Sequence, residues 1–133
     1  MPGRLQDKVA VITGAAGGLG RAIALAYHKE GAHVVCADLR EVSRFESDSG
    51  ESQGKTHELI TKDGGKAIFQ SVDVTNPEQV EALVKKAVEW GGRLDIMVNN
   101  AGIAFEASDP QPVWNVSPER WQKTQDVNIT GVL

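Results

Sequence analysis

The stretch TGAAGGLG at residues 13–20 follows the apolar run KVAVI and precedes the helix-like segment RAIALAYHKEG. A helix begins with backbone N–H groups that lack partners and carry partial positive charge, so a phosphate can satisfy them. Glycine removes the side chains that would keep the phosphate away from the backbone. Three positions would serve the tight turn, the close approach and the helix packing: Gly14, Gly18 and Gly20. The stretch therefore predicts a phosphate-binding turn, with an ordinary glycine-rich strand–helix connection as the alternative.

Apolar strand-like segments and amphipathic helix-like segments alternate along the chain. The expected strands cover residues 8–14, 33–39, 66–74 and 93–102. The expected helices run from Leu19 up to Gly31, over 55–63, from Pro77 to Gly91, and from Pro118 to the C-terminus. Helical crossovers between buried strands imply a parallel sheet with right-handed connections. The sequence thus predicts an α/β fold, a Rossmann-like doubly wound parallel sheet, with residues 1–133 forming one domain.

Two connections can be interpreted from their local sequence. Residues 41–54 are polar and acidic without periodicity, so we expect a solvated loop. The helix after the third strand can begin in two ways. Asn76 can cap it with Pro77 in the first helical position, or Thr75 and Glu78 can form a capping box.

Asp38 lies at the end of the second expected strand, about 20 residues after the glycine stretch begins. An acid at this place accepts hydrogen bonds from the adenine ribose hydroxyls of a dinucleotide. Its charge would repel a 2′-phosphate, so Asp38, with Leu39 beside it as a further cofactor-binding residue, favours NAD over NADP. Two alternatives stay open, because Arg40 could meet a 2′-phosphate and Asp38 could simply be an aspartate that begins a loop. The sequence predicts NAD as the cofactor, with NADP less favoured.

The glycine spacing is G-x-x-x-G-x-G, which differs from the common dinucleotide fingerprint G-x-G-x-x-G. The pattern Thr13-Gly14-x-x-x-Gly18-x-Gly20 instead resembles the cofactor motif of the short-chain dehydrogenase/reductase family. Three further segments resemble motifs of that family in the same order: Asp73-Val74, Asn99-Asn100-Ala101-Gly102, and Trp121 followed by Val127-Asn128-Ile129-Thr130-Gly131. Together the four motifs cover nearly the whole chain.

The resemblance implies how the cofactor would be held. The pyrophosphate would lie on Gly14, Gly18, Leu19 and Gly20, and the adenine on Asp73 and Val74. The nicotinamide ribose would lie nearest to Asn100, Ala101 and Gly102. The family's sheet order is 3-2-1-4-5-6-7, so the chain would correspond to a fold truncated after the fourth strand and its following helix.

Asn128 has three interpretations. The resemblance implies a role in a water-bridged proton relay to an active-site lysine. From the residues alone, Asn128 could be a core asparagine whose amide finds its hydrogen bonds, or part of the glycosylation signal Asn128-Ile129-Thr130. The glycosylation interpretation is poor without a secretory signal. We expect Asn128 to support catalysis.

The family's catalytic serine and its Y-x-x-x-K motif do not occur in this sequence. Tyr27 is the single tyrosine, and Gly31 follows it four positions later. We expect these residues to lie beyond Leu133, and two functions stay open. The chain is either the cofactor part of an enzyme that exchanges hydride with an alcohol or ketone, or a non-catalytic dinucleotide-binding fragment. The Asn99–Gly102 and Val127–Gly131 segments argue against a third class, the methyltransferases.

Composition excludes several other functions. The net charge of -4 gives no reason to expect nucleic acid, and no apolar stretch approaches the ~20 residues of a membrane span. One cysteine, Cys36, and three scattered histidines offer no metal site. We expect Cys36 to pack as a small apolar residue and the chain to be cytoplasmic. The resemblance further implies a small-molecule substrate and a homodimer or homotetramer.

Overall fold

The computed structural model describes residues 2–43, 54–103 and 109–133. Within these ranges the strands are β1 (Val9–Thr13), β2 (His33–Asp38), β3 (Ala67–Ser71) and β4 (Ile96–Val98). All neighbouring strands pair in parallel, in the order β3-β2-β1-β4. The predicted parallel sheet is therefore confirmed, and its order is the one that the family resemblance implied for these strands.

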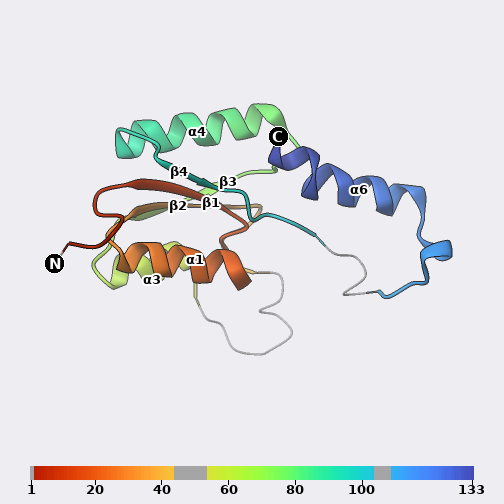
Figure 1. Ribbon diagram of the computed structural model, residues 1–133, viewed down its shortest axis with the longest axis horizontal. Coiled ribbons are helices and arrows are strands. Elements are labelled where there is room, and N and C mark those ends of the chain that lie inside the picture. The colour runs from red at the N-terminus through yellow and green to blue at the C-terminus, as the bar shows by residue number, and fades with distance from the viewer. Residues whose placement is uncertain (1, 44–53, 104–108) are drawn as a thin grey trace.

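Helices cover both faces of the sheet, as a doubly wound fold requires (Figure 1). Their bounds are α1 (Gly18–Lys29), α3 (Thr56–Lys62), α4 (Pro77–Gly91) and α6 (Pro118–Asn128), with short 3-10 turns at Val113–Asn115 and Thr130–Val132. Figure 1 shows α1 and α3 together on one face and α4 on the other, whereas α6 extends beyond the edge of the sheet. The carboxyl ends of the strands therefore meet the glycine-rich loop, the start of α4 and the end of α6.

The core lies on both faces of β1 and β2 because these strands are buried on both sides. Ile12 and Val34 pack beneath α1 and α3 with Ile60. Val11 and Val35, which are register partners, pack against α4. Successive residues of a strand point to opposite faces, so a strand covered on both faces must be apolar throughout. This explains the unbroken apolar run that the sequence shows before the glycine stretch.

The ends of α4 distinguish the two interpretations of its start. The side-chain oxygen of Asn76 accepts hydrogen bonds from the backbone N–H groups of Glu78 and Gln79 at 3.0 and 3.2 Å. Asn76 is therefore the cap, and Pro77 takes the first turn, where its missing N–H is not needed. The alternative capping box of Thr75 and Glu78 is wrong, because the Thr75 hydroxyl donates to Asp73 instead.

Two elements are shorter than the sequence predicted. β4 covers Ile96–Val98 only, because the N–H of Asn100 turns back to the carbonyl of Val98 at 3.1 Å. The last helix ends at Asn128 rather than at the C-terminus, and a 3-10 turn follows. In that turn Gly131 lies close to Val74, because a Cβ on Gly131 would be 2.8 Å from Val74 Cγ2. The predicted loop at 41–54 lies mostly outside the described residues.

Candidate functional site

A cleft of about 350 Å³ lies at the carboxyl ends of the strands. It sits where the chain order reverses between β1 and β4, which is where open α/β sheets bind their ligands. Nearly all of the predicted cofactor-binding residues line it: Gly14, Gly18, Leu19, Asp38, Leu39, Asp73, Val74, Asn100, Ala101 and Gly102. The structure thus brings together residues from four separate motifs. Gly20 does not line the cleft.

The glycines of the loop have separate structural tasks. Gly14 has a φ of 69° and Gly18 a φ of 57°, a left-handed conformation that other residues rarely adopt. A Cβ on Gly18 would meet no atom within 4 Å, so this glycine borders open space in the cleft wall. A Cβ on Gly20 would lie 2.0 Å from the carbonyl oxygen of Gly14. Gly20 therefore lets α1 pack against the turn and leaves the contact with a ligand to its neighbours.

The N-terminus of α1 opens onto this cleft. Its first internal hydrogen bond runs from the N–H of Arg21 to the carbonyl of Gly17 at 3.3 Å, and Gly17 provides no side-chain cap. The preceding N–H groups, those of Gly18, Leu19 and Gly20, come before the first helical bond and have no partner inside the helix. Because the helix dipole adds partial positive charge here, the arrangement can bind an anion.

Asp38 joins the end of β2 to the glycine loop. Its carboxylate accepts hydrogen bonds from the backbone N–H of Ala16 at 3.0 Å and from that of Leu39 at 2.7 Å. Each carboxylate oxygen can accept more than one hydrogen bond, so acceptor capacity remains on the side of the cleft. The residue thus begins a loop and also lines the cleft. Arg40 and Ser43 line the same end.

Thr13 is a structural residue of the site to which the sequence assigned no role beyond its place in the motif. Its hydroxyl donates to the carbonyl of Val98 at 3.2 Å and accepts the N–H groups of Asn100 and Ala101, both at 3.0 Å. The Asn100 amide returns a hydrogen bond to the carbonyl of Thr13 at 3.1 Å. The ends of β1 and β4 are therefore fixed to one another. A hydroxyl at the end of an otherwise apolar buried strand was the signal for this task.

Asp73 shapes the wall opposite the glycine loop. Its carboxylate accepts hydrogen bonds from the hydroxyl of Thr75 at 2.6 Å and from the N–H of Thr75 at 2.9 Å. These two hydrogen bonds favour the ionised form and hold the pKa of Asp73 below its usual range. Val74 lines the cleft beside it and packs against Gly131 at the chain's last turn.

Asn128 lies next to the cleft without lining it. Its side-chain oxygen accepts the N–H of Ile103 at 2.8 Å, and its amide nitrogen donates to the carbonyl of Ile103 at 2.9 Å. Its side chain is exposed, so the interpretation as a core asparagine is wrong. The two hydrogen bonds tie the end of α6 to the segment that follows Gly102. A part in a proton relay stays a prediction.

Two further groups of observations concern chemistry away from the cleft. Within residues 2–43, 54–103 and 109–133, no cluster of histidine, cysteine and acidic side chains could hold a metal ion. Burial raises the pKa of the Cys36 thiol to about 12, so Cys36 packs as a neutral apolar residue, as expected. A bilayer-spanning helix is also absent from the described part of the chain, where none has the necessary length and apolar character.

Comparison with known proteins agrees with this geometry. The family model described as short chain dehydrogenase matches residues 8–133. Over 129 residues the chain is 39% identical to glucose 1-dehydrogenase 2 of Bacillus subtilis, covering 97% of this chain and 46% of that protein. It is 42% identical over 130 residues to an uncharacterized oxidoreductase of Methylorubrum extorquens, covering 98% and 48%.

A crystal structure of a short chain dehydrogenase from Mycobacterium smegmatis superposes with a TM-score of 0.79 at 34% identity, over 99% of this chain and 51% of that one. The chain spans about half the length of the relatives that it matches. Because the family model covers all but the first residues and the four motifs converge on one cleft, this chain belongs to the short-chain dehydrogenase family.

Proposed function

We propose that this chain forms the NAD-binding part of an oxidoreductase, which exchanges hydride between nicotinamide and a small alcohol or ketone. The observation that carries the proposal is the cleft in which the N-terminus of α1 faces the same space as the carboxylate of Asp38. An anion-binding helix end and an acidic acceptor on one cavity match the two ends of an adenosine diphosphate group. Members of the family bind NAD or NADP, so the chemical class of the ligand follows from the family.

The residues that line the cleft suit each part of the dinucleotide. The N–H groups of Gly18 and Leu19 would bind the pyrophosphate, and the open space beside Gly18 leaves room for it. Val72 and Val74 offer an apolar wall for the adenine. At the other end, the short chain from Asn100 to Gly102 leaves backbone and small side chains against a ribose. The chemistry of this set of donors and surfaces fits the cofactor.

The choice of NAD over NADP rests on the charge of Asp38. Two backbone N–H groups hold its carboxylate at the cleft wall, where it would accept hydrogen bonds from the adenine ribose. A phosphate on the ribose 2′ position would face this negative charge at short range, which is unfavourable in a partly buried site. Arg40 lines the same end and would weaken that discrimination without reversing it.

Hydride transfer would be the task of the bound nicotinamide, while this chain binds the cofactor, orients it and excludes water. The N–H groups of the helix end and the Asp38 carboxylate would orient the cofactor by its pyrophosphate and its adenosine. Asn128 would help to hold a proton path at the substrate end, through the backbone of Ile103. A proton donor for the substrate oxygen is expected from a serine and a Y-x-x-x-K motif, which this sequence does not contain.

Calorimetric titration with NAD, NADP and S-adenosylmethionine tests the proposal. We expect binding of NAD, weaker binding of NADP and no binding of S-adenosylmethionine. Binding of S-adenosylmethionine without NAD would overturn the assignment. The enzymatic part is tested by translating the genomic sequence after the codon for Leu133, which should contain the serine and the Y-x-x-x-K motif.

A stop codon directly after Leu133 would leave the second function, a dinucleotide-binding protein without chemistry. The observation that favours this second function is the missing catalytic tyrosine, since Tyr27 lies in α1 and is followed by Gly31. A homodimer or homotetramer is also part of the proposal for the whole protein, and sedimentation would measure it.

A further inference from the structure

Arg21 is a buried cation near the positive end of a helix. It is the fourth residue of α1, and its exposed fraction is 7%. The helix dipole disfavours a positive charge in this first part of a helix, and burial adds a desolvation cost. A residue kept under these conditions needs strong compensating contacts, and those contacts indicate what it does.

The side chain of Arg21 connects the glycine loop to the start of α3. Its Nη2 donates to the carbonyl of Ala16 at 2.9 Å and also to the carbonyl of Gly54. Its Nε donates to the hydroxyl of Thr56 at 3.1 Å. The Thr56 hydroxyl in turn donates to the carbonyl of Ala15 at 2.6 Å. Both side chains are buried, Thr56 with an exposed fraction of 1%.

These contacts hold two successive carbonyls of the glycine loop. Neither Arg21 nor Thr56 lines the cleft, so the carbonyl oxygens of Ala15 and Ala16 are held away from it. The N–H groups of the same two residues are bound as well, by the carbonyl of Ala37 at 3.1 Å and by Asp38 at 3.0 Å. Each peptide is therefore held on both of its polar sides. Because a carbonyl oxygen facing the cleft would repel a phosphate, the direction of these peptides decides whether the loop can bind one.

We propose that Arg21 and Thr56 are positioning residues that hold the glycine loop in its pyrophosphate-binding form. The inference rests on the proposed function of the cleft as a dinucleotide site. The charge of Arg21 also lies one residue beyond the free N–H groups of the helix, where it adds positive potential toward an anion. The start of α3, in effect, completes the phosphate site from behind.

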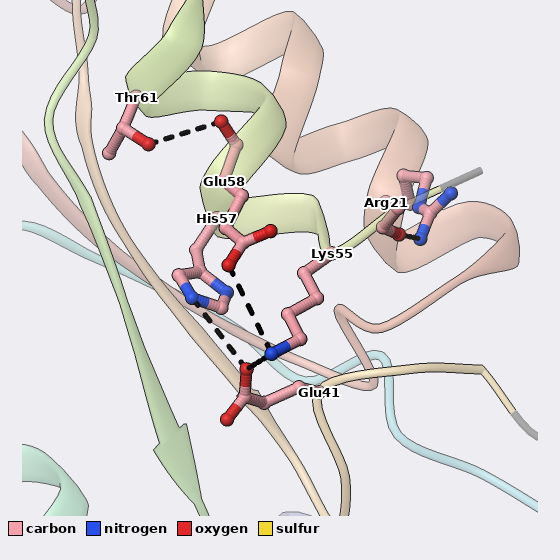
Figure 2. Close-up of polar contacts among 7 residues, drawn as sticks. Arg21, Glu41, Lys55, His57, Glu58 and Thr61 are labelled. Atoms are coloured by element: carbon pink, nitrogen blue, oxygen red, sulfur yellow. Dashed lines mark hydrogen bonds and ion pairs between the residues drawn. The ribbon is translucent and has the colours of Figure 1, made fainter. Parts of the chain in front are cut away.

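A neighbouring set of charges does not reach the loop. Figure 2 shows Lys55 Nζ 2.8 Å from Glu41 Oε2, and His57 Nε2 3.9 Å from the same oxygen. The side chains of this ion pair are each 40% exposed, so solvent screens them and their contribution is small. The buried bridge of Arg21 and Thr56 therefore carries the connection between α3 and the glycine loop.

Two threonines of α3 provide a matched test, since both lie in the same short helix. Thr56→Val removes the hydroxyl that holds the loop, whereas Thr61→Val removes a hydroxyl that donates only to the carbonyl of Glu58 in its own helix at 3.1 Å (Figure 2). Thr56→Ser keeps the hydroxyl and serves as the rescue variant. Calorimetry with ADP and with adenosine separates loss of phosphate binding from general damage, because adenosine lacks the phosphates.

We expect Thr56→Val to weaken ADP binding about tenfold and adenosine binding by less than about twofold. Thr61→Val and Thr56→Ser should match the unmodified chain in both titrations, and circular dichroism should confirm that every variant is folded at the measuring temperature. Arg21→Lys, which retains the charge but not the planar set of donors, should weaken ADP binding in the same selective way.

An unchanged ratio of ADP to adenosine affinity in folded Thr56→Val would overturn the inference, as would equal losses for the two ligands. An unmodified chain that binds neither ADP nor NAD would overturn the proposed function and the inference with it. If Thr56→Val does not fold, folded Arg21→Lys decides by the same ratio.

Discussion

Thr13 and Asn100 fix the ends of β1 and β4 to one another through both of their side chains. The Thr13 hydroxyl accepts the N–H of Asn100 at 3.0 Å, and the Asn100 amide donates to the carbonyl of Thr13 at 3.1 Å. Three hydrogen bonds converge on this one hydroxyl, whose residue has an exposed fraction of 3%. The switch point of the sheet, where the cleft opens, is thus held by side chains where the regular strand pairing stops.

Thr13→Val should destabilise the protein, because valine has the same shape but leaves two buried N–H groups and a carbonyl without their partner. The expected loss is about 1–3 kcal/mol in the free energy of unfolding. Urea unfolding followed by circular dichroism measures it. Thr13→Ser keeps the hydroxyl and should lose less than Thr13→Val; equal losses would show that the methyl contacts, and not the hydrogen bonds, matter at this position.

Asp38→Ala should weaken NAD binding more than NADP binding, since it removes both an acceptor for the ribose and a charge that repels a 2′-phosphate. Asp38→Asn separates the two effects, because its amide oxygen can still accept the N–H of Ala16. We expect Asp38→Asn to retain more stability than Asp38→Ala and to narrow the gap between NAD and NADP. Calorimetric affinities for both cofactors measure this gap, and equal losses for the two would remove Asp38 from its proposed role.

Gly20→Ala should be strongly destabilising, because the new Cβ would lie 2.0 Å from the carbonyl oxygen of Gly14 and backbone must move. The loss should exceed about 2 kcal/mol, which is in the range of overpacked cores. Gly92→Ala is the matched control. Gly92 has open space around a Cβ and a φ of 79°, so its alanine variant should lose only about 1–2 kcal/mol from backbone strain. Comparable losses in thermal unfolding would contradict the steric explanation.

Thr75→Val should lower stability in a manner that depends on pH. The hydrogen bonds from Thr75 lower the pKa of Asp73 from its usual value near 3.8, so their stabilisation is fully present above that value. It is lost as the pH falls through the lowered pKa, when the carboxylate becomes protonated. The difference in unfolding free energy between Thr75→Val and the unmodified protein should therefore be largest near neutral pH and shrink in acid. A difference that stays constant down to about pH 2 would show that protonation of Asp73 is not its cause.

The sequence predicted the elements that depend on local pattern. The apolar run before Thr13, the cap at Asn76 and the breaks at Gly31 and Gly92 all depend on neighbours within one turn or one strand. The order of the strands came from the family resemblance, and the cleft then followed from where the strands end. The ends of β4 and α6 were wrong because packing between Gly131 and Val74, and the turn at Asn100, override local periodicity.

The supporting contacts of the site could not be predicted, because they join residues far apart in sequence. Thr13 meets Asn100 across 87 positions, and Thr56 meets Ala15 across 41. Hydrophobic periodicity carries no information about such pairs, and Arg21 looks in the sequence like an ordinary polar residue of an amphipathic helix. Only the three-dimensional arrangement distinguishes it from a solvated arginine.

The fixed peptides of Ala15 and Ala16 have a consequence for the kinetics of binding. A loop whose N–H and carbonyl groups are already engaged does not lose conformational entropy when a nucleotide arrives. The free protein would meet its ligand in the binding conformation, so association needs no slow rearrangement of this loop. Differences in affinity among nucleotides should then lie chiefly in how fast each one dissociates.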